Sequence, residues 1–327
     1  MRKKILVVGA AGYIGSHTVL LLNEAGYEAH ILDDFSYGHR DFVEGNKLYE
    51  GNLGDKALLD TIFSRHKYSA VFHFAAFTYV GESVSNPAKY YQNNVSSTLS
   101  LLEKMIEYKM DNFIFSSTCA TYGEPEKIPL RESHPQKPIN PYGWSKLMVE
   151  QILEDFHHAY KLNSVIFRYF NAAGADKEGR RGERHNRETH LIPVILEAAA
   201  GKRESVSIFG NDYKTRDGTC IRDYIHVSDL ARAHLLGMEK LWAKGGLHKY
   251  NLGNGQGFSV KEIIDSCSRI TTKKIKTKDI ERREGDPPAL IGDSSKAARE
   301  LKWKPEYTKL DDIIQSAWNW HKKDWKR

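Results

Sequence analysis

The chain begins with an apolar run, a glycine-rich turn and a helical segment, which together constrain its fold more than any other feature. The apolar residues 5–8 are typical of a strand buried in a parallel sheet. Residues 13–25 then read as a helix, and Gly26 is well suited to end it. A second apolar strand follows at 29–32. This strand–helix–strand order predicts two parallel strands of one sheet, joined by a helix.

Three glycines and an acidic residue within this unit predict a dinucleotide site. Gly9, Gly12 and Gly15 allow backbone amides and the helix N-terminus to approach a pyrophosphate. Asp33 and Asp34 end the second strand, where a carboxylate accepts the hydroxyl protons of a ribose. The spacing Gly-x-x-Gly-x-x-Gly differs from the commoner Gly-x-Gly-x-x-Gly, and a lone glycine triplet can be a chance turn. The surrounding strand, helix and acid favour cofactor binding.

Asp33 also indicates which cofactor is bound. A carboxylate accepts two ribose hydroxyl protons but repels a 2′-phosphate, so NAD is favoured over NADP. His39 and Arg40 follow shortly and could face a phosphate, although a solvated loop is the simpler interpretation of both residues.

A tyrosine and a lysine lie four residues apart at the start of a later helix. Tyr142 and Lys146 therefore share a helix face, and an ammonium beside a phenol is expected to lower the pKa of the phenol. Such a pair is by itself usually an exposed helix face. Thr118, however, follows the strand 112–115, and ligands bind beyond the carboxyl ends of such strands. We expect Tyr142 as acid/base, Lys146 as its tuner and ribose anchor, and Thr118 as a hydrogen-bonding hydroxyl.

Apolar strands alternate with helical patterns through the first half of the chain. The further strands are predicted at 70–74, 112–115 and 164–170, and the further helices at 58–66, 87–108 and after Tyr142. This alternation predicts an α/β fold, a Rossmann-type doubly wound parallel sheet. The charged segment 176–188 reads as a loop, which places a domain boundary near it. We expect an NAD-binding domain over 1–174 and a smaller mixed α/β substrate domain over 175–327. The segment 221–244 could instead return to the sheet of the first domain.

Composition narrows the classes of partner. The net charge is +6, but the basic excess is concentrated at 273–278, 282–283 and 321–327, which is typical of solvated surface. Nucleic-acid binding needs a continuous basic patch with stacking aromatic residues, so we expect none. No apolar run reaches the eighteen or so residues of a membrane helix. The three cysteines, Cys119, Cys220 and Cys267, lack metal or redox spacing, so we expect no metal site and a reducing, cytoplasmic location.

These segments resemble the extended short-chain dehydrogenase/reductases and, within them, the UDP-sugar 4-epimerases. The glycine turn and the Tyr/Lys pair are shared across that superfamily, whereas the segments 208–213, 222–227 and 283–286 are more specific. The resemblance runs nearly end to end and also includes 73–76, 80–83, 93–95, 116–118, 168–171 and 190–193.

The resemblance implies an NAD-dependent isomerase that interconverts UDP-glucose and UDP-galactose through a 4-keto sugar. Tyr142 would take the proton of the 4-hydroxyl while hydride passes from C4 to tightly bound NAD, and the sugar would then turn over and receive the hydride on its other face. The implied cofactor positions are Gly9, Gly12, Tyr13, Ile14, Gly15, Asp33, Asp34, Asn52, Leu53, Phe74, Ala75, Ala76, Asn93, Ser116, Tyr142, Lys146 and Tyr169. The implied substrate positions are Thr118, Asn171, His190, Leu191, Ser207, Ile208, Phe209, Arg222, Arg283, Asp286 and Leu290. Arg222 and Arg283 are expected to bind the pyrophosphate, because guanidinium is planar and permanently charged.

Three positions depart from the pattern of this group. Asn52 replaces an aspartate that accepts from adenine, and an amide oxygen can do the same. Thr78 replaces a lysine near the nicotinamide ribose in some members. Leu290 replaces a larger aromatic residue, which would leave room for an N-acetyl group on the sugar. The pair 290–291 could instead be only a short buried strand.

These patterns also argue against two other functions and predict an oligomeric state. A dehydratase of the superfamily needs acidic residues after the threonine, but Cys119 and Ala120 stand there. A non-catalytic NAD-sensing module would have no need for Tyr142 and Lys146.

A homodimer is expected, formed by the long helix from Pro87 and the Tyr142 helix. Its candidate contacts, which packing on the sheet explains equally well, are Leu99, Leu102, Met148 and Leu153.

Overall fold

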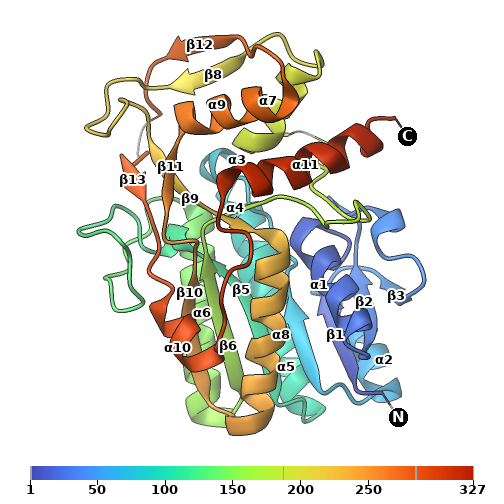
Figure 1. The fold of residues 1–327 in the computed structure, drawn as a ribbon. Coiled ribbons are helices and arrows are strands. Elements are labelled where there is room, and N and C mark those ends of the chain that lie inside the picture. The colour runs from blue at the N-terminus through green and yellow to red at the C-terminus, as the bar shows by residue number, and fades with distance from the viewer. Residues whose placement is uncertain (1, 187, 284–285, 327) are drawn as a thin grey trace.

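The computed structural model describes residues 2–186, 188–283 and 286–326. Its larger part is a seven-stranded sheet in which all neighbouring strands are parallel, in the order β10-β6-β5-β4-β1-β2-β3 (Figure 1). The strands are β1 (Lys4–Val8), β2 (Glu28–Asp33), β3 (Lys47–Glu50), β4 (Ala70–His73), β5 (Asn112–Thr118), β6 (Asn163–Tyr169) and β10 (Leu247–Leu252). The strand order reverses next to β1, as in doubly wound folds, so the predicted fold class is confirmed.

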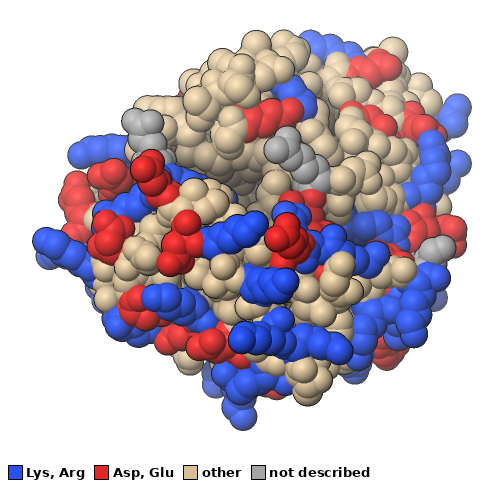
Figure 2. Space-filling view, turned by 90° about the horizontal axis from the view of Figure 1, so that it is seen from above, with Lys and Arg blue, Asp and Glu red and all other residues tan. Residues whose placement is uncertain are grey.

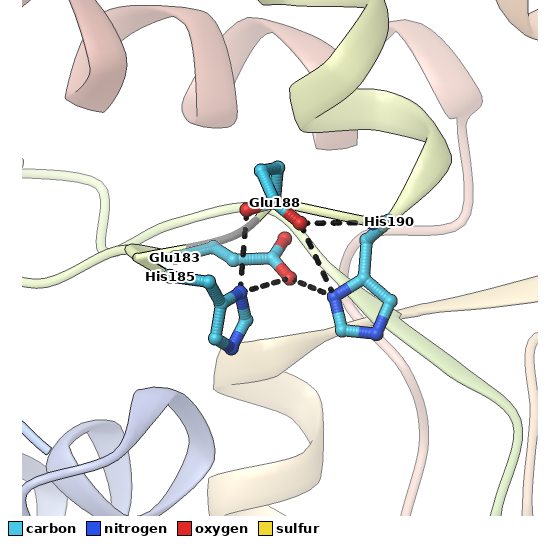
Figure 3. Close-up of side chains that lie close together, drawn as sticks. All are labelled: Glu183, His185, Glu188 and His190. Carbon is cyan, nitrogen blue, oxygen red and sulfur yellow. Dashed lines mark hydrogen bonds and ion pairs between the residues drawn. The ribbon is translucent and has the colours of Figure 1, made fainter. Parts of the chain in front are cut away.

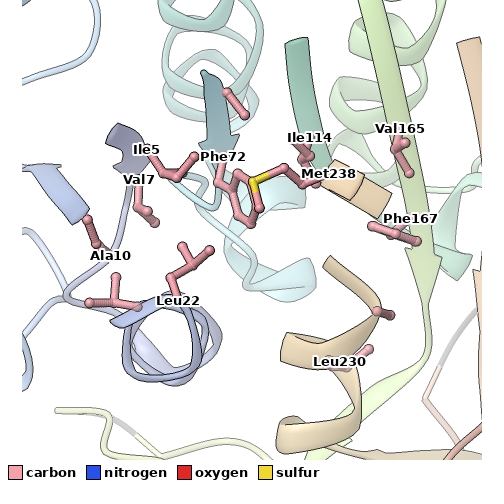
Figure 4. Packing of buried hydrophobic residues seen from close by; sticks show 14 of the residues in the cluster. Ile5, Val7, Ala10, Leu22, Phe72, Ile114, Val165, Phe167, Leu230 and Met238 are labelled. Carbon is pink, nitrogen blue, oxygen red and sulfur yellow. The ribbon is translucent and has the colours of Figure 1, made fainter. Parts of the chain in front are cut away.

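Helices cover both faces of this sheet. They are α1 (Tyr13–Glu24), α2 (Lys56–Arg65), α5 (Ser97–Glu107), α6 (Pro141–Tyr160), α8 (Val227–Lys244) and the short α10 (Ser295–Leu301). Successive residues of a strand point to opposite faces. Ile5 and Val7 of β1 accordingly pack with α1 and α8 (Figure 4), whereas Leu6 and Val8 pack with α2, α5 and α6.

A smaller part lies at the top of Figure 1, beyond the carboxyl ends of the large sheet. Its four-stranded sheet contains β7 (Asn171–Ala173), β9 (Ile221–His226), β11 (Gly257–Ser259) and β13 (Ala289–Leu290), and a two-stranded sheet pairs β8 (Val206–Phe209) with β12 (Thr277–Ile280). Three helices complete it: α7 (Leu191–Ala199), α9 (Val260–Thr271) and α11 (Leu310–Asp324). These elements have an apolar core of their own, to which Ile195, Ile208, Ile263 and Ile313 belong.

The segment 221–244 is divided between the two parts. It forms a strand and then a helix, as predicted, but β9 pairs within the smaller sheet while α8 packs against α1, β5 and β6 of the larger one. The next strand, β10, also joins the large sheet, beside β6. The chain thus crosses between the parts more than once, and the domain limits 1–174 and 175–327 stay a prediction.

The predicted helix 87–108 contains a widened turn. Helix α4 (Pro87–Tyr90) continues into a π-helical turn, η2 (Tyr91–Ser96), before α5 begins. Asn94 in this turn is buried; its side chain accepts a hydrogen bond from the backbone N–H of Phe77 and donates one to Ser145 Oγ on α6. The sequence periodicity did not predict this turn, nor β3 and the short helices η1 (Arg40–Phe42), α3 (Val80–Ser85) and η3 (Cys119–Thr121).

Two of the residues considered for a dimer contact belong to the core. Leu102 and Leu153 are fully buried between α5, α6 and the sheet, so packing on the sheet is the correct interpretation for both. Leu99 is half-buried, and Met148 is exposed on the outer side of α6, together with Trp144. The dimer prediction therefore depends on Trp144 and Met148.

The surface charge is mixed on the face that Figure 2 shows. Lysine and arginine side chains alternate there with aspartate and glutamate rather than forming one continuous basic area (Figure 2). Among the described helices, none combines the length and the apolar character needed to cross a membrane.

Candidate active site

The glycine turn between β1 and α1 is shaped for close backbone approach. Gly9 has a φ of +76°, and a Cβ atom placed on it would lie 2.3 Å from the backbone nitrogen of Ala75. A Cβ on Gly15 would lie 2.5 Å from the carbonyl oxygen of Gly9. Gly12 is the N-cap of α1, and no side chain caps this helix. The turn therefore leaves the N-terminus of α1 suited to a pyrophosphate.

Asp33 lies at the end of β2 and holds this turn through backbone contacts. Its Oδ2 accepts from the N–H of Ala11 at 2.8 Å, and its Oδ1 accepts from the N–H of Phe35 at 2.9 Å. Burial raises the pKa of Asp33, and these two hydrogen bonds oppose the rise. Asp34 instead accepts from the side chain of Asn52 at 3.1 Å, so the Asn52 amide is tied to the second acid of the pair.

A cavity extends from the glycine turn along the carboxyl ends of β1, β2 and β4. Nine predicted cofactor residues line it: Gly9, Gly12, Asp33, Asp34, Leu53, Phe74, Ala75, Ala76 and Asn93. It is also lined by residues that the sequence did not single out: Val8, Leu32, Ser36, Tyr37, Gly38, Gly51 and Phe77. Most of them lie within five residues of the end of a strand of the sheet. The residues that line the cavity suit a dinucleotide with its ribose hydroxyls at Asp33.

Other predicted cofactor residues have protein partners next to this cavity. The hydroxyl of Tyr13 donates to the carbonyl oxygen of Gly174 at 2.6 Å, and Ile14 packs against the sheet core. The hydroxyl of Ser116 is hydrogen-bonded to Nε2 of His234 at 3.2 Å. His39 and Arg40 are also engaged, with the carbonyl oxygen of Arg184 and with Glu50. Neither is among the residues that line the cavity.

The structure brings Tyr142 and Thr118 together. Asn140 caps α6 by accepting from the N–H of Gly143 at 2.9 Å, which fixes where the helix begins. A Cβ on Gly143 would lie 2.7 Å from the carbonyl oxygen of Ala120, so only glycine lets α6 approach η3 this closely. As a result Tyr142 lies beside the carboxyl end of β5, where the side chain of Thr118 acts to lower the pKa of its hydroxyl. The sequence predicted that these two residues lie near each other, and their catalytic roles stay a prediction.

Lys146 lies one helical turn further along α6 and is buried. Its Nζ donates to the carbonyl oxygen of Ser116 at 2.8 Å and faces the ring of Phe115. Burial lowers the pKa of Lys146 to about 7, against an opposing effect of Glu150. Burial also raises the pKa of Tyr142 well above its usual value, as does Tyr169, and only the side chain of Thr118 opposes this. The predicted lowering of the Tyr142 pKa by Lys146 is therefore not found: desolvation outweighs any attraction.

A buried ion pair fixes helix α6 to the large sheet. Glu150, one turn after Lys146, binds Arg168 of β6 through two nitrogens, with Nη2 at 2.6 Å from Oε2. Ser117 of β5 donates to the same carboxylate at 2.5 Å, and Arg168 also donates to the hydroxyl of Tyr122 at 3.0 Å. Both charged side chains are only 1% exposed. The pair joins α6 to β5 and β6 at the level of the candidate catalytic residues.

A second group of predicted residues meets across the smaller part of the molecule. Arg222 of β9 forms an ion pair with Asp286, and its strand position pairs with Leu290 of β13. The guanidinium of Arg283 lies over the ring of Phe209, 3.7 Å from its centre. Glu284 and Gly285, between the two predicted residues of that motif, lie outside the described part of the chain.

The remaining substrate candidates have mixed surroundings. Asn171 donates to the carbonyl oxygen of Asp223 at 3.0 Å, and Leu191 is the first residue of α7, with His190 as its N-cap. Ser207 is half-buried beside Ile208. The side chain of Ile208 belongs to the core of the smaller part, so only its backbone can face a ligand.

The chain is similar to known proteins over almost its full length. The sequence model of a family described as GDP-mannose 4,6 dehydratase matches residues 6–317. The chain is 52% identical to a UDP-glucose 4-epimerase of Halalkalibacterium halodurans over 318 residues, covering 97% of this chain and 95% of that protein. A crystal structure of UDP-glucose 4-epimerase from Brucella ovis in complex with NAD superimposes with a TM-score of 0.95 at 48% identity, covering 97% and 98% of the two chains. A UDP-Glc/GlcNAc 4-epimerase from Campylobacter jejuni superimposes with a TM-score of 0.86 at 43% identity, covering 98% and 99%.

Proposed function

The chain belongs to the UDP-glucose 4-epimerase family, and on this basis we propose that it interconverts UDP-galactose and UDP-glucose with NAD as its cofactor. The observation that carries the proposal is that Tyr142 lies near Thr118, at the end of the sheet where the dinucleotide cavity lies. The matched family model bears the name of a dehydratase, but the residues after Thr118 are Cys119 and Ala120, and neither can supply the acid that dehydration needs.

The residues present fit NAD. The glycine turn would hold the pyrophosphate at the N-terminus of α1, and Asp33 would hold the ribose hydroxyls, while Leu53 and Phe74 line the cavity. NAD supplies a hydride acceptor and donor for C4 of the sugar when it is bound. Lys146 lies beside the carbonyl of Ser116 and would anchor the second ribose.

The proton step belongs to Tyr142. Its phenol is placed near Thr118 by the cap of α6, so both hydroxyls could reach one sugar hydroxyl. Burial favours the protonated phenol, and a cationic Lys146 one helical turn away would favour the phenolate. Tyr142 can therefore exchange a proton with the 4-hydroxyl in both directions, as an epimerase requires.

The nucleotide would be bound on the other side of the cleft. Arg222 and Arg283 carry permanent charges suited to a pyrophosphate, and Asp286 orients Arg222 through their ion pair. Binding energy from the UDP group, remote from the reacting carbon, lets the sugar itself be held loosely. A loosely held sugar can present either face to the cofactor.

Purified protein tests the proposal directly. We expect bound nicotinamide in the protein as isolated, and conversion of UDP-galactose to UDP-glucose without added NAD. A protein that binds NAD but converts neither sugar would contradict the activity while leaving the cofactor site intact.

Cofactor choice should depend on the charge of Asp33. The variant Asp33→Asn is expected to raise the ratio of NADP affinity to NAD affinity, because it removes the charge that repels a 2′-phosphate. Asparagine retains a carbonyl oxygen for the N–H of Ala11, which alanine would leave unpaired in a buried position. Apo protein reconstituted with each cofactor provides the measurement, with Asp34→Asn as the matched control. An unchanged ratio would assign the preference to another residue.

Leu290 is proposed to leave room for an N-acetyl group on the sugar. It is half-buried, pairs in strand register with Arg222, and packs against the same apolar cluster as Cys119, the residue after Thr118. These neighbours support a position between the pyrophosphate side and the reacting side of the proposed substrate site. We therefore propose that the enzyme also interconverts UDP-N-acetylglucosamine and UDP-N-acetylgalactosamine.

The variant Leu290→Tyr is expected to abolish the N-acetylated activity and to spare UDP-galactose, because a clash costs more than a lost contact. Both substrates are assayed on the wild type and on the variant, with Leu290→Met as a control of similar volume. A wild type that does not use the acetylated sugars, or a tyrosine variant that still does, would show that Leu290 is not the gate.

The protein is also proposed to form a homodimer through α6. Trp144 and Met148, one turn apart on this helix, are 43% and 41% exposed, which leaves an apolar strip on its outer side. Light scattering at micromolar concentration should give twice the chain mass, and Met148→Arg should shift it toward one chain. A wild type of single-chain mass would contradict the proposal.

The three free cysteines support a reducing, cytoplasmic location.

A further inference from the structure

Four side chains of the loop before α7 converge on one point: Glu183, His185, Glu188 and His190 (Figure 3). One ligand atom from each lies within 4.8 Å of all the others. The Nδ1 atom of His185 is 3.5 Å from Glu183 Oε1 and 3.2 Å from Glu188 Oε2. The Nδ1 atom of His190 is 2.5 Å from Glu183 Oε1 and 3.7 Å from Glu188 Oε1. The four groups thus alternate, nitrogen and oxygen, around a common centre.

These separations suit a small cation. A tetrahedral ion with bonds of about 2.0–2.1 Å holds its ligand atoms about 3.3–3.4 Å apart. Both contacts of His185 lie within about 0.2 Å of that value, and His190 is 3.7 Å from the other oxygen of Glu188. The fourth, between His190 and Glu183, is a short hydrogen bond that would open by less than 1 Å to admit an ion.

The two carboxylates are buried, and a buried carboxylate needs a neighbouring positive charge to stabilise it. Their side chains are only 4% and 6% exposed, for Glu183 and Glu188 respectively. Within the described chain, neither carboxylate forms an ion pair with a lysine or an arginine, and their ion-pair partners are the two histidines. Metal binding requires both imidazoles to be neutral, and in that state the four groups would carry a charge of −2, which a divalent cation would neutralise.

The ligands are also held in place by their surroundings. Glu188 Oε1 accepts from the backbone N–H groups of Thr189 and His190, both at 2.8 Å. The indole N–H of Trp320 donates to the carbonyl oxygen of Glu183, and the ring of His185 packs edge-on against Tyr79. Such contacts with surrounding groups orient metal ligands and strengthen binding.

We propose that Glu183, His185, Glu188 and His190 form a binding site for a divalent transition-metal ion, with zinc as the best match. Imidazole nitrogens suit zinc and its neighbours, whereas magnesium and calcium prefer sites made of oxygen alone. Metal binding at this site does not require the proposed epimerase activity, although His190 is also among the substrate positions that the resemblance implies. The sequence predicted no metal site because its cysteines lack metal spacing, but this site contains no cysteine.

The test uses untagged full-length protein that has been treated with a chelator and dialysed. Zinc chloride is titrated by calorimetry, and retained metal is counted by mass spectrometry, with magnesium chloride as a parallel titration. We expect one zinc ion per chain, weak or absent magnesium binding, and a loss of zinc affinity of at least about tenfold in His185→Ala and in Glu188→Gln. The control His158→Ala removes an exposed histidine whose Nδ1 bonds only the Glu154 carbonyl, and should keep wild-type zinc binding.

The proposal is overturned if the wild type retains no zinc, if magnesium binds better than zinc, or if both loop variants bind zinc like the wild type. Far-UV circular dichroism confirms that each variant is folded, and either variant alone is sufficient if the other does not fold. Neither measurement uses catalytic turnover, so failure of the proposed function would leave the result unaffected.

Discussion

Replacing Tyr142 by phenylalanine is expected to lower the epimerase turnover by about 10²- to 10⁴-fold, the usual contribution of a general acid/base. The substitution removes only the hydroxyl, which lies near Thr118. The ring, the cap of α6 and the contact of Gly143 with Ala120 all remain. The fold and NAD content should therefore stay at wild-type level while the proton transfer is lost.

Steady-state rates with UDP-galactose, together with bound nicotinamide per chain, provide the measurement. Tyr160→Phe is the matched control, since Tyr160 is an exposed residue at the end of the same helix. A near-normal rate in Tyr142→Phe would remove this residue from the mechanism. A loss of NAD together with the rate would show instead that the hydroxyl is needed to build the cofactor site.

Replacing Arg168 by methionine is expected to lower the free energy of unfolding by about 3–5 kcal/mol. Arg168 and Glu150 are both almost completely buried, and the arginine also donates to Tyr122 and Gln136. Without the guanidinium, the Glu150 carboxylate would remain in the interior with Ser117 and Gln136 as its only hydrogen-bond partners among the described residues. An uncompensated buried charge is far more costly than the loss of the pair itself, because water cannot reach it.

Urea unfolding of the wild type and the variant gives this quantity. Arg131→Met serves as the control, because Arg131 is 74% exposed and pairs with Asp293 at the surface, where such a pair contributes about 0–1 kcal/mol. The double variant Arg168→Met, Glu150→Leu should recover much of the stability, since it removes both charges. A loss below about 1 kcal/mol in Arg168→Met would mean that water or another residue compensates Glu150.

Local patterns in the sequence were sufficient for the first strand–helix–strand unit, the glycine turn, Asp33 and the pairing of Tyr142 with Thr118. Each of these depends on a few neighbouring residues and on a general rule about where parallel strands end. The same rules could not predict that β10 returns to the large sheet, because a strand acquires its neighbours through contacts distant in sequence. They also could not predict the widened turn at Tyr91–Ser96, which keeps the apolar spacing of an ordinary helix.

The electrostatic properties of the site were decided by the tertiary structure. Spacing alone suggested that Lys146 lowers the pKa of Tyr142, whereas the folded chain buries both groups, and desolvation raises the pKa of the phenol and lowers that of the amine. The sequence could not distinguish Leu102 and Leu153 from Met148 as candidate dimer contacts. The structure shows that the two leucines are buried in the core, whereas Met148 is exposed. The sequence likewise predicted only a charged loop where the structure brings together Glu183, His185, Glu188 and His190. Burial and convergence are set by all the elements that surround a residue, and a linear pattern records only its neighbours along the chain.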